Sequence, residues 1–253
     1  MGELVVKDNA LINASYHLDL VEQRLILLAI VAARQTGKGI NAKEALTIHA
    51  DSYATQFGVH RNTAYQALRD ACNNLFDRQF SYQGVNEHGE IEYFKSRWVS
   101  RVSYVAEAAK VRLILAPDVV PLVTRLEQEF TKYDLDQVSG LSSSYSVRLY
   151  ELLIQWRSVG RTPVLELDEF RRHLGVPENQ YIRLEAFRRR VLDISINQIN
   201  EHTDITASYG QQKSGRIITG FTFDIKLKKA KKAAKIEDKA PKKQKKRNTT
   251  GLG

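Results

Sequence analysis

The sequence lacks the residues on which several classes of protein depend. Its 253 residues include one cysteine, Cys72, so no internal disulfide can form, which fits a reducing compartment. The longest apolar run, Leu25 to Ala33, is much shorter than the ~20 residues that a helix needs to span a bilayer. The N-terminus has no basic segment followed by an apolar one, as a signal peptide would. These absences predict a cytoplasmic protein without a membrane segment.

The motifs of common catalytic and metal-binding sites are also missing. Gly37-Lys38-Gly39 lacks the upstream glycine and the Ser or Thr of a phosphate-binding loop. The six histidines are scattered, with no H-x-H or H-E-x-x-H spacing that would hold a metal. A nicking enzyme that uses tyrosine is expected to bring such a metal pair. We therefore predict a protein that is not an enzyme and has no cofactor and no metal.

Positive charge is concentrated in two places. Of the net charge of +9, the segment from Lys226 onward accounts for +10, so residues 1–225 together carry −1. Within that neutral body, residues 171–190 hold six arginines against two glutamates. Such local segregation indicates a surface for nucleic acid better than the overall charge does. The lysine-rich end adds either salt-sensitive, non-specific affinity for DNA or simply solubility.

One motif occurs twice, at an offset of 117 residues. In each copy a short apolar strand leads to a short helix, a Gly-Val turn and a second helix, with a hairpin after it. The matched positions are Ile48 and Leu165, Tyr53 and Phe170, Phe57 and Leu174, Gly58 and Gly175, and Val59 and Val176. An apolar helix precedes each copy, and this is the order of elements in a winged helix. The sequence thus predicts an α+β fold with two tandem winged-helix domains.

The predicted division of the chain follows from that repeat. Residues 1–135 form the N-terminal winged helix, which we expect to carry dimerisation and accessory DNA contacts. Residues 136–144 contain Gly and a run of Ser and are the expected linker. Residues 145–227 form the C-terminal winged helix, with the main DNA contacts. Residues 228–253, rich in Lys and Ala, are expected to be a disordered basic tail.

Aspartates mark where several helices are expected to begin. Asp19 and Glu22 have the spacing of a capping box, and the helix that they begin is predicted to end near Gly37. Two more aspartates are predicted to cap the short helices of the repeated motif, Asp51 and Asp168.

The strongest candidate for DNA recognition is the helix predicted over residues 183–200. At 100° per residue, one face is predicted to be buried, formed by Leu184, Phe187, Val191 and Ile194. Arg189 then points almost opposite that face, with Arg188 and Arg190 beside it and Arg183 at the start. The arginine fork matches guanine or a phosphate with two hydrogen bonds, so these four are candidate DNA contacts.

A hairpin after that helix supplies further candidates. Its predicted tip, Gly210 to Arg216, contains Lys213 and Arg216 and no acid, which suits a phosphate backbone. Solubility alone could also explain two basic residues in a loop. For the helix, the alternative is a solvated face on which the arginines pair with Glu185 and Asp193.

The corresponding helix of the first copy offers a weaker set of candidates. Arg61, Asn62, Gln66 and Arg69 lie on its predicted outer face, with Asp70 nearby. They are as consistent with an ordinary polar helix surface as with base contacts, and the analogy to winged-helix docking alone favours DNA.

Three segments together resemble a known family. They are N-A-L-I-N-A-S-Y-H-L-D-L-V-E-Q-R-L-I-L-L-A, S-Y-S-V-R-L-Y-E-L-L-I-Q-W-R, and F-R-R-R-V-L-D-I-S-I-N-Q-I-N with the Phe-rich last strand. Between residues 9 and 227 they resemble, in the same order, the iteron-binding replication initiators of bacterial plasmids, which have two winged-helix domains. The basic tail lies outside the resemblance.

The resemblance implies a function and partners. A monomer would bind tandem repeats (iterons) in double-stranded DNA at a plasmid origin, help to open the adjacent AT-rich DNA, and recruit the host replication initiator and helicase. A homodimer joined through the N-terminal domain would bind an inverted repeat and repress its own gene. The main base contacts would come from the C-terminal domain, at Arg188, Arg189 and Arg190. Two domains in successive major grooves imply a repeat of about 20 bp.

Our hypothesis is therefore a sequence-specific, non-enzymatic initiator of plasmid replication. A two-domain transcriptional regulator is the first alternative and would bind an operator only. An origin-nicking enzyme would form a covalent tyrosine adduct with DNA. A non-specific binder that works through the tail would lose binding when residues 228–253 are removed.

Overall fold

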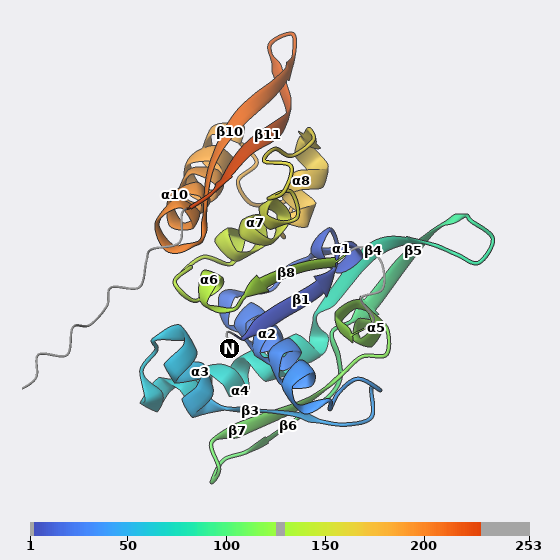
Figure 1. The fold of residues 1–253 in the computed structure, drawn as a ribbon, viewed down its shortest axis with the longest axis vertical. Coiled ribbons are helices and arrows are strands. Elements are labelled where there is room, and N and C mark those ends of the chain that lie inside the picture. The colour runs from blue at the N-terminus through green and yellow to red at the C-terminus, as the bar shows by residue number, and fades with distance from the viewer. Residues whose placement is uncertain (1–2, 125–129, 229–253) are drawn as a thin grey trace, which may run out of the picture.

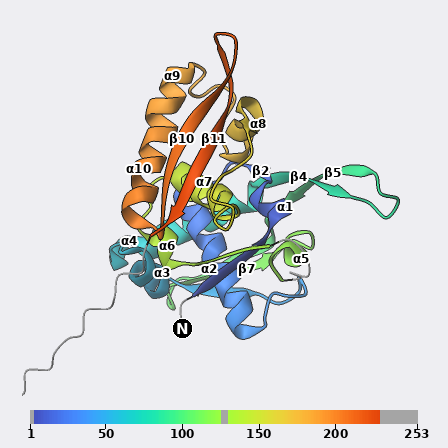
Figure 2. The same ribbon diagram turned by 45° about the horizontal axis from the view of Figure 1, so that its top comes forward.

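A computed structural model describes residues 3–124 and 130–228 (Figures 1 and 2). The elements occur in the order β1 (Leu4–Asp8), α1 (Asn9–Ile12), β2 (Ser15–Tyr16), α2 (Leu20–Thr36), β3 (Leu46–His49), α3 (Ala50–Phe57), α4 (Arg61–Asp77), β4 (Gln79–Val85), β5 (Ile91–Arg97), β6 (Val99–Val105), β7 (Lys110–Leu115), α5 (Val119–Thr124), β8 (Phe130–Asp134), α6 (Asp136–Ser139), α7 (Ser144–Ile154), β9 (Leu165–Glu166), α8 (Leu167–His173), α9 (Leu184–Phe187), the π-helical turn η1 (Arg188–Leu192), α10 (Asp193–His202), β10 (Ile205–Ser214) and β11 (Ile217–Leu227). Of the predicted basic tail, all but Lys228 lies outside the described residues.

The same architecture occurs twice, which confirms the predicted tandem winged helices. The first contains α2, β3, α3, α4 and the hairpin β6–β7, and the second contains α7, β9, α8, the helix α9–η1–α10 and the hairpin β10–β11. The strand orders β3-β7-β6 and β9-β11-β10 are equivalent, with antiparallel pairing throughout. The two hairpins are the wings, and they point to opposite ends of the long axis (Figure 1).

The repeated positions occupy equivalent places in the two winged helices. Tyr53 and Phe170 are both fully buried, in α3 and α8. Gly58 and Gly175 follow those helices at φ +61° and +74°, in the left-handed region that a residue without Cβ adopts at little cost. At Gly175 a Cβ would also clash with the backbone oxygen of Tyr16. The second turn is thus pressed against the N-terminal segment, whereas the first is open.

Helix α2 is the centre of the first winged helix. Asp19 and Glu22 form the predicted capping box, with hydrogen bonds of 2.8 Å in each direction, and Gly37 ends the helix at φ +68°. The helix is apolar on most sides because it packs against α4, β3 and β1. Both predicted boundaries are therefore confirmed.

The two other predicted caps are wrong. Helices α3 and α8 begin earlier, after His49 and Glu166, so Asp51 and Asp168 lie inside the first turn. A carboxylate still complements the helix dipole at that position, although it does not cap the backbone.

An additional hairpin, β4–β5, separates α4 from the wing of the first winged helix. It pairs with β2 in its own sheet and projects away from the body (Figure 1). The predicted linker, residues 136–144, is packed rather than extended. It contains α6, and its Leu141 is fully buried with a backbone oxygen that accepts from Arg24 at 3.1 Å. The predicted domain division stays a prediction.

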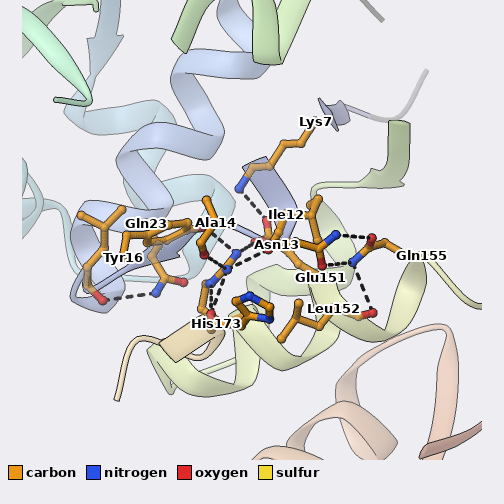
Figure 3. Close-up of polar contacts among 12 residues, drawn as sticks. Lys7, Ile12, Asn13, Ala14, Tyr16, Gln23, Glu151, Leu152, Gln155 and His173 are labelled. Atoms are coloured by element: carbon orange, nitrogen blue, oxygen red, sulfur yellow. Dashed lines mark hydrogen bonds and ion pairs between the residues drawn. The ribbon is translucent and has the colours of Figure 1, made fainter. Parts of the chain in front are cut away.

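A buried ionic cluster joins the N-terminal segment to the second winged helix (Figure 3). Arg148 of α7 and Lys7 of β1 both pair with Glu151, at 2.9 and 2.6 Å, and all three are almost fully buried. The guanidinium also donates to the backbone oxygens of Ile12, Ala14 and His173. Burial tends to raise the pKa of Glu151, but the charges of Lys7 and Arg148 outweigh this and hold the pKa below its usual range.

Candidate nucleic-acid interface

The recognition helix of the second winged helix contains a π-helical turn. It runs through α9, η1 and α10, close to the predicted range of 183–200. In η1 the backbone N–H of Asp193 donates to the carbonyl oxygen of Arg188, five residues back instead of four. The turn therefore holds one more residue than an α-helical turn.

That extra residue shifts the buried face of the helix. Phe187 and Val191 are buried as predicted, but Ile194 is 43% exposed, so its predicted place on the buried face is wrong. From the last residue of the π-turn onward, the buried apolar positions are Leu192, Ile196 and Ile199. Phe187 and Leu192 face the core although they are five residues apart, because the π-turn brings them into phase. The predicted buried face assumed a rotation of 100° per residue along the whole helix, which does not hold in the π-turn.

The outward arginines are exposed. Arg189 and Arg190 belong to the π-turn, and Arg183 precedes the first turn of the helix. Among the described residues, no salt bridge includes any of these three side chains. The alternative in which they pair with Glu185 and Asp193 is therefore not what the structure has. Their contact with DNA stays a prediction.

Arg188 is held differently from its neighbours. It is half-buried, and its Nε donates to the hydroxyl of Tyr209 on β10 over a long 3.5 Å. That hydroxyl donates in turn to Asp193 Oδ1 at 2.6 Å. Burial, together with this hydrogen bond, raises the pKa of Tyr209. The network ties the π-turn to the wing.

The wing places its basic residues at one end of the molecule. Its turn consists of Gly215 and Arg216, so the predicted tip, which began at Gly210, is too long. Gly210 pairs with Thr222 within the hairpin because the antiparallel ladder continues to Ser214. Lys213 and Arg216 are both exposed. The tip lies at the same end of the molecule as α9 (Figure 2).

Arg171 belongs to the scaffold rather than to the exposed basic surface. Its guanidinium donates to the backbone oxygens of Gln180 and Tyr181, at 2.7 and 3.0 Å, and lies 4.9 Å from the ring centre of Phe187. It thereby holds the turn between α8 and α9. Of the six arginines between residues 171 and 190, Arg171 is therefore held by contacts within the protein and does not belong to the basic surface.

In the first winged helix, most of the predicted DNA-contacting side chains on α4 interact with other residues of the protein. Arg61 donates two hydrogen bonds to Asp51, at 2.8 and 2.6 Å, and these lower the pKa of Asp51. Gln66 donates to Asp70 at 2.7 Å. Of the other two, Arg69 is half-buried 5.3 Å from the ring centre of Tyr104, and Asn62 is exposed.

The wing of the first winged helix carries two basic residues that our sequence interpretation missed. Arg101 on β6 and Arg112 on β7 are exposed. Ser103 pairs with Arg112 across the hairpin, so both arginines lie on the same face of the sheet. The alternation of outward and inward positions along these two strands is the sequence signal that could have identified both arginines. Two hairpins follow α4, and the sequence did not show which of them was the wing.

The described residues offer no sign of a metal centre or a membrane span. Across residues 3–124 and 130–228, no three His, Cys, Asp or Glu side chains come together as a metal site. Within the same part of the chain, no helix combines the length and apolarity needed to cross a bilayer.

Comparisons with known proteins identify the family. Residues 4–154 match the model of the initiator replication protein WH1 domain, and residues 166–225 match that of the initiator Rep protein WH2 domain. A replication initiation protein of Escherichia coli is 27% identical over 90% of this chain and 71% of its own length.

Two solved structures are also similar. The WH1 domain of MSBI1.176, a replication protein isolated from a multiple sclerosis patient, is 65% identical, with a TM-score of 0.41 over 48% of this chain and 92% of that one. The Pi initiator protein, crystallised in complex with iteron DNA, has the same fold, with a TM-score of 0.73 and 19% identity over 91% of this chain and 99% of that one. The family matches cover most of the chain, which therefore belongs to the initiator replication proteins with WH1 and WH2 domains.

Proposed function

We propose that this protein initiates plasmid replication by binding tandem repeats in double-stranded DNA at the origin. The observation that carries the proposal is the surface formed by Arg183, Arg189 and Arg190 on the recognition helix with Lys213 and Arg216 on the wing. These side chains are exposed, and none pairs with an acid among the described residues. The iteron DNA bound to the Pi initiator protein, which has the same fold, supports this choice of ligand.

The proposed roles follow from position on that surface. Arg188, Arg189 and Arg190 lie at the major groove, where they contact base edges, and Arg183 contacts a phosphate. Lys213 and Arg216 contact the neighbouring backbone. In the first winged helix, a second set makes accessory contacts at the other end of the repeat, namely Arg61, Asn62, Gln66 and Arg69. Two winged helices in successive grooves match a repeat of about 20 bp.

The remaining steps are proposed from family membership. Binding to several repeats helps to open adjacent AT-rich DNA, and the host replication initiator and helicase are recruited there. A homodimer represses the protein's own gene at an inverted repeat. Exposed Val85, Ile91 and Tyr93 on the edge hairpin β4–β5 support self-association through the first winged helix, since an apolar strand edge pairs readily with another copy. Tyr93→Lys should shift the protein towards monomer in sedimentation, without weakening binding to a single repeat.

The decisive experiment is a footprint of the full-length protein on the DNA that flanks its own gene. Tandem protected repeats of about two helical turns each are expected. Protection of a single inverted repeat alone would instead establish the transcriptional regulator. A covalent protein–DNA adduct with strand cleavage would establish the nicking enzyme.

The same assay separates the proposal from tail-driven binding. A variant that ends at Leu227 should keep the protected repeats and lose mainly salt-sensitive affinity. Loss of all protection in that variant would favour a non-specific binder.

A further inference from the structure

Tyr209 occupies an unusual position between the wing and the recognition helix. Its ring packs against Phe221 and Phe223, with centroid distances of 5.6 and 6.1 Å. From this fixed base the hydroxyl reaches two residues of the recognition helix, Arg188 Nε at 3.5 Å and Asp193 Oδ1 at 2.6 Å. One side chain of the wing thus contacts both ends of the π-turn.

Those two contacts fit a widened turn. In a regular α-helix, residues five apart point about 140° away from each other. The two side chains would then leave the helix on different sides. The π-turn, closed by the hydrogen bond from the Asp193 N–H to the Arg188 carbonyl, rotates them towards the same side. It also accounts for the burial of Phe187 and Leu192, which are five residues apart as well.

The hydroxyl has a second consequence for the exposed arginines. Asp193 is the acid that follows the π-turn, and its Oδ1 accepts the short hydrogen bond from Tyr209. No salt bridge joins Asp193 to Arg189 or Arg190 among the described residues. The tyrosine engages the carboxylate that could otherwise neutralise them.

We propose that Tyr209 is a positioning residue that determines DNA sequence preference, by clamping the π-turn and so fixing the direction of Arg189 and Arg190. The inference rests on the proposed DNA-binding function and deepens it. It proposes that a side chain outside the recognition helix sets the direction in which the arginines of that helix point. Phosphate contacts tolerate a rotated arginine, whereas a base edge does not. The clamp therefore acts on specificity more than on affinity.

The test compares Tyr209→Phe with wild type on repeat DNA and on a scrambled duplex of the same length. Loss of the hydroxyl should lower the preference for the repeat roughly tenfold, the effect of one hydrogen bond to a charged group. Affinity for the scrambled duplex and its salt dependence should stay within about twofold of wild type, because the phosphate contacts remain. The matched control is Tyr104→Phe on the other wing, which should change neither.

A second pair of variants tests the phase directly. Deleting Arg188 leaves Arg189 and Arg190 but closes the turn to four residues. Arg188→Ala removes the same side chain, yet it keeps the number of residues in the turn and the shorter hydrogen bond from Tyr209 to Asp193. The deletion should lose the preference for the repeat, and the alanine variant should keep most of it. Thermal unfolding of each variant shows whether the domain remains folded.

The outcomes separate this inference from the proposed function. A wild-type protein without preference for repeat DNA overturns the function. If wild type prefers the repeat and Tyr209→Phe keeps that preference, only the clamp is wrong. An equal loss on both duplexes would make Tyr209 a structural residue and would also overturn the clamp.

Discussion

The two recognition helices have the same place in the same fold but different surface chemistry. Helix α4 is a regular α-helix whose Arg61 and Gln66 are engaged by Asp51 and Asp70. The helix α9–η1–α10 contains a π-turn and exposes Arg189 and Arg190. Arg61 must give up its partner before it binds DNA, whereas Arg189 and Arg190, which form no salt bridge among the described residues, need not. On this basis we propose that the second winged helix determines sequence preference and that the first adds affinity.

The largest effect is expected where the N-terminal segment meets the second winged helix. Glu151→Ala leaves Lys7 and Arg148 buried without their carboxylate, and it should lower the free energy of unfolding by about 3–5 kcal/mol. Urea denaturation measures this, with the exposed Glu169→Ala as the control. A loss below about 1 kcal/mol would show that the cluster does not hold the N-terminal segment to the second winged helix.

The same cluster predicts a pH dependence. Because the folded protein holds the pKa of Glu151 below its ordinary value of 4.5, the contribution is present above that pH and is lost as pH falls through the lowered pKa. The difference in stability between wild type and Glu151→Ala should therefore shrink in acid.

The repeated glycines provide a matched pair across the two winged helices. Gly58→Ala should cost about 1–2 kcal/mol of stability, because φ is positive and the space around it is open. Gly175→Ala should cost more, since the added methyl group also meets the backbone of Tyr16. Thermal unfolding of both variants measures the difference. Equal losses would mean that the N-terminal segment moves aside freely.

Single arginine substitutions test the difference between the recognition helices. Arg189→Ala should weaken binding to the repeat by about 1–3 kcal/mol and relax the preference at one base pair. Arg61→Ala should have a smaller effect, spread over all sequences. Binding to a set of single-base variants of the repeat measures both. If Arg189→Ala weakens all sequences equally, Arg189 is a phosphate contact instead.

The smallest effect is expected from a substitution that frees Arg61 of α4 from its acid, as Arg189 and Arg190 of the other recognition helix already are. Asp51→Asn removes the acid that holds Arg61, so α4 should bind DNA slightly more tightly, with about one more counterion in the salt dependence. Stability should hardly change because the pair is exposed. Unchanged affinity and salt dependence would show that Arg61 lies away from the DNA.

Local signals were sufficient for much of the fold. The capping box of Asp19 and Glu22 and the turns at Gly58 and Gly175 depend on residues within a few positions, so the sequence pattern predicted them correctly. The five repeated positions predicted both winged helices, because each copy has apolar residues and a glycine at the same positions in the same order. The sequence did not show which hairpin was the first wing, since β4–β5 and β6–β7 have similar strand patterns.

The sequence by itself determined two winged helices and a concentration of arginine in the second. Only the tertiary structure decided which of those arginines are available. Arg171 supports a turn and Arg61 pairs with Asp51, while Arg189 and Arg190 remain exposed on a π-turn. The physical reason is the range of the contacts. Helix propensity and turn chemistry act between near neighbours, but the direction of a surface arginine depends on groups such as Tyr209, brought close only by folding.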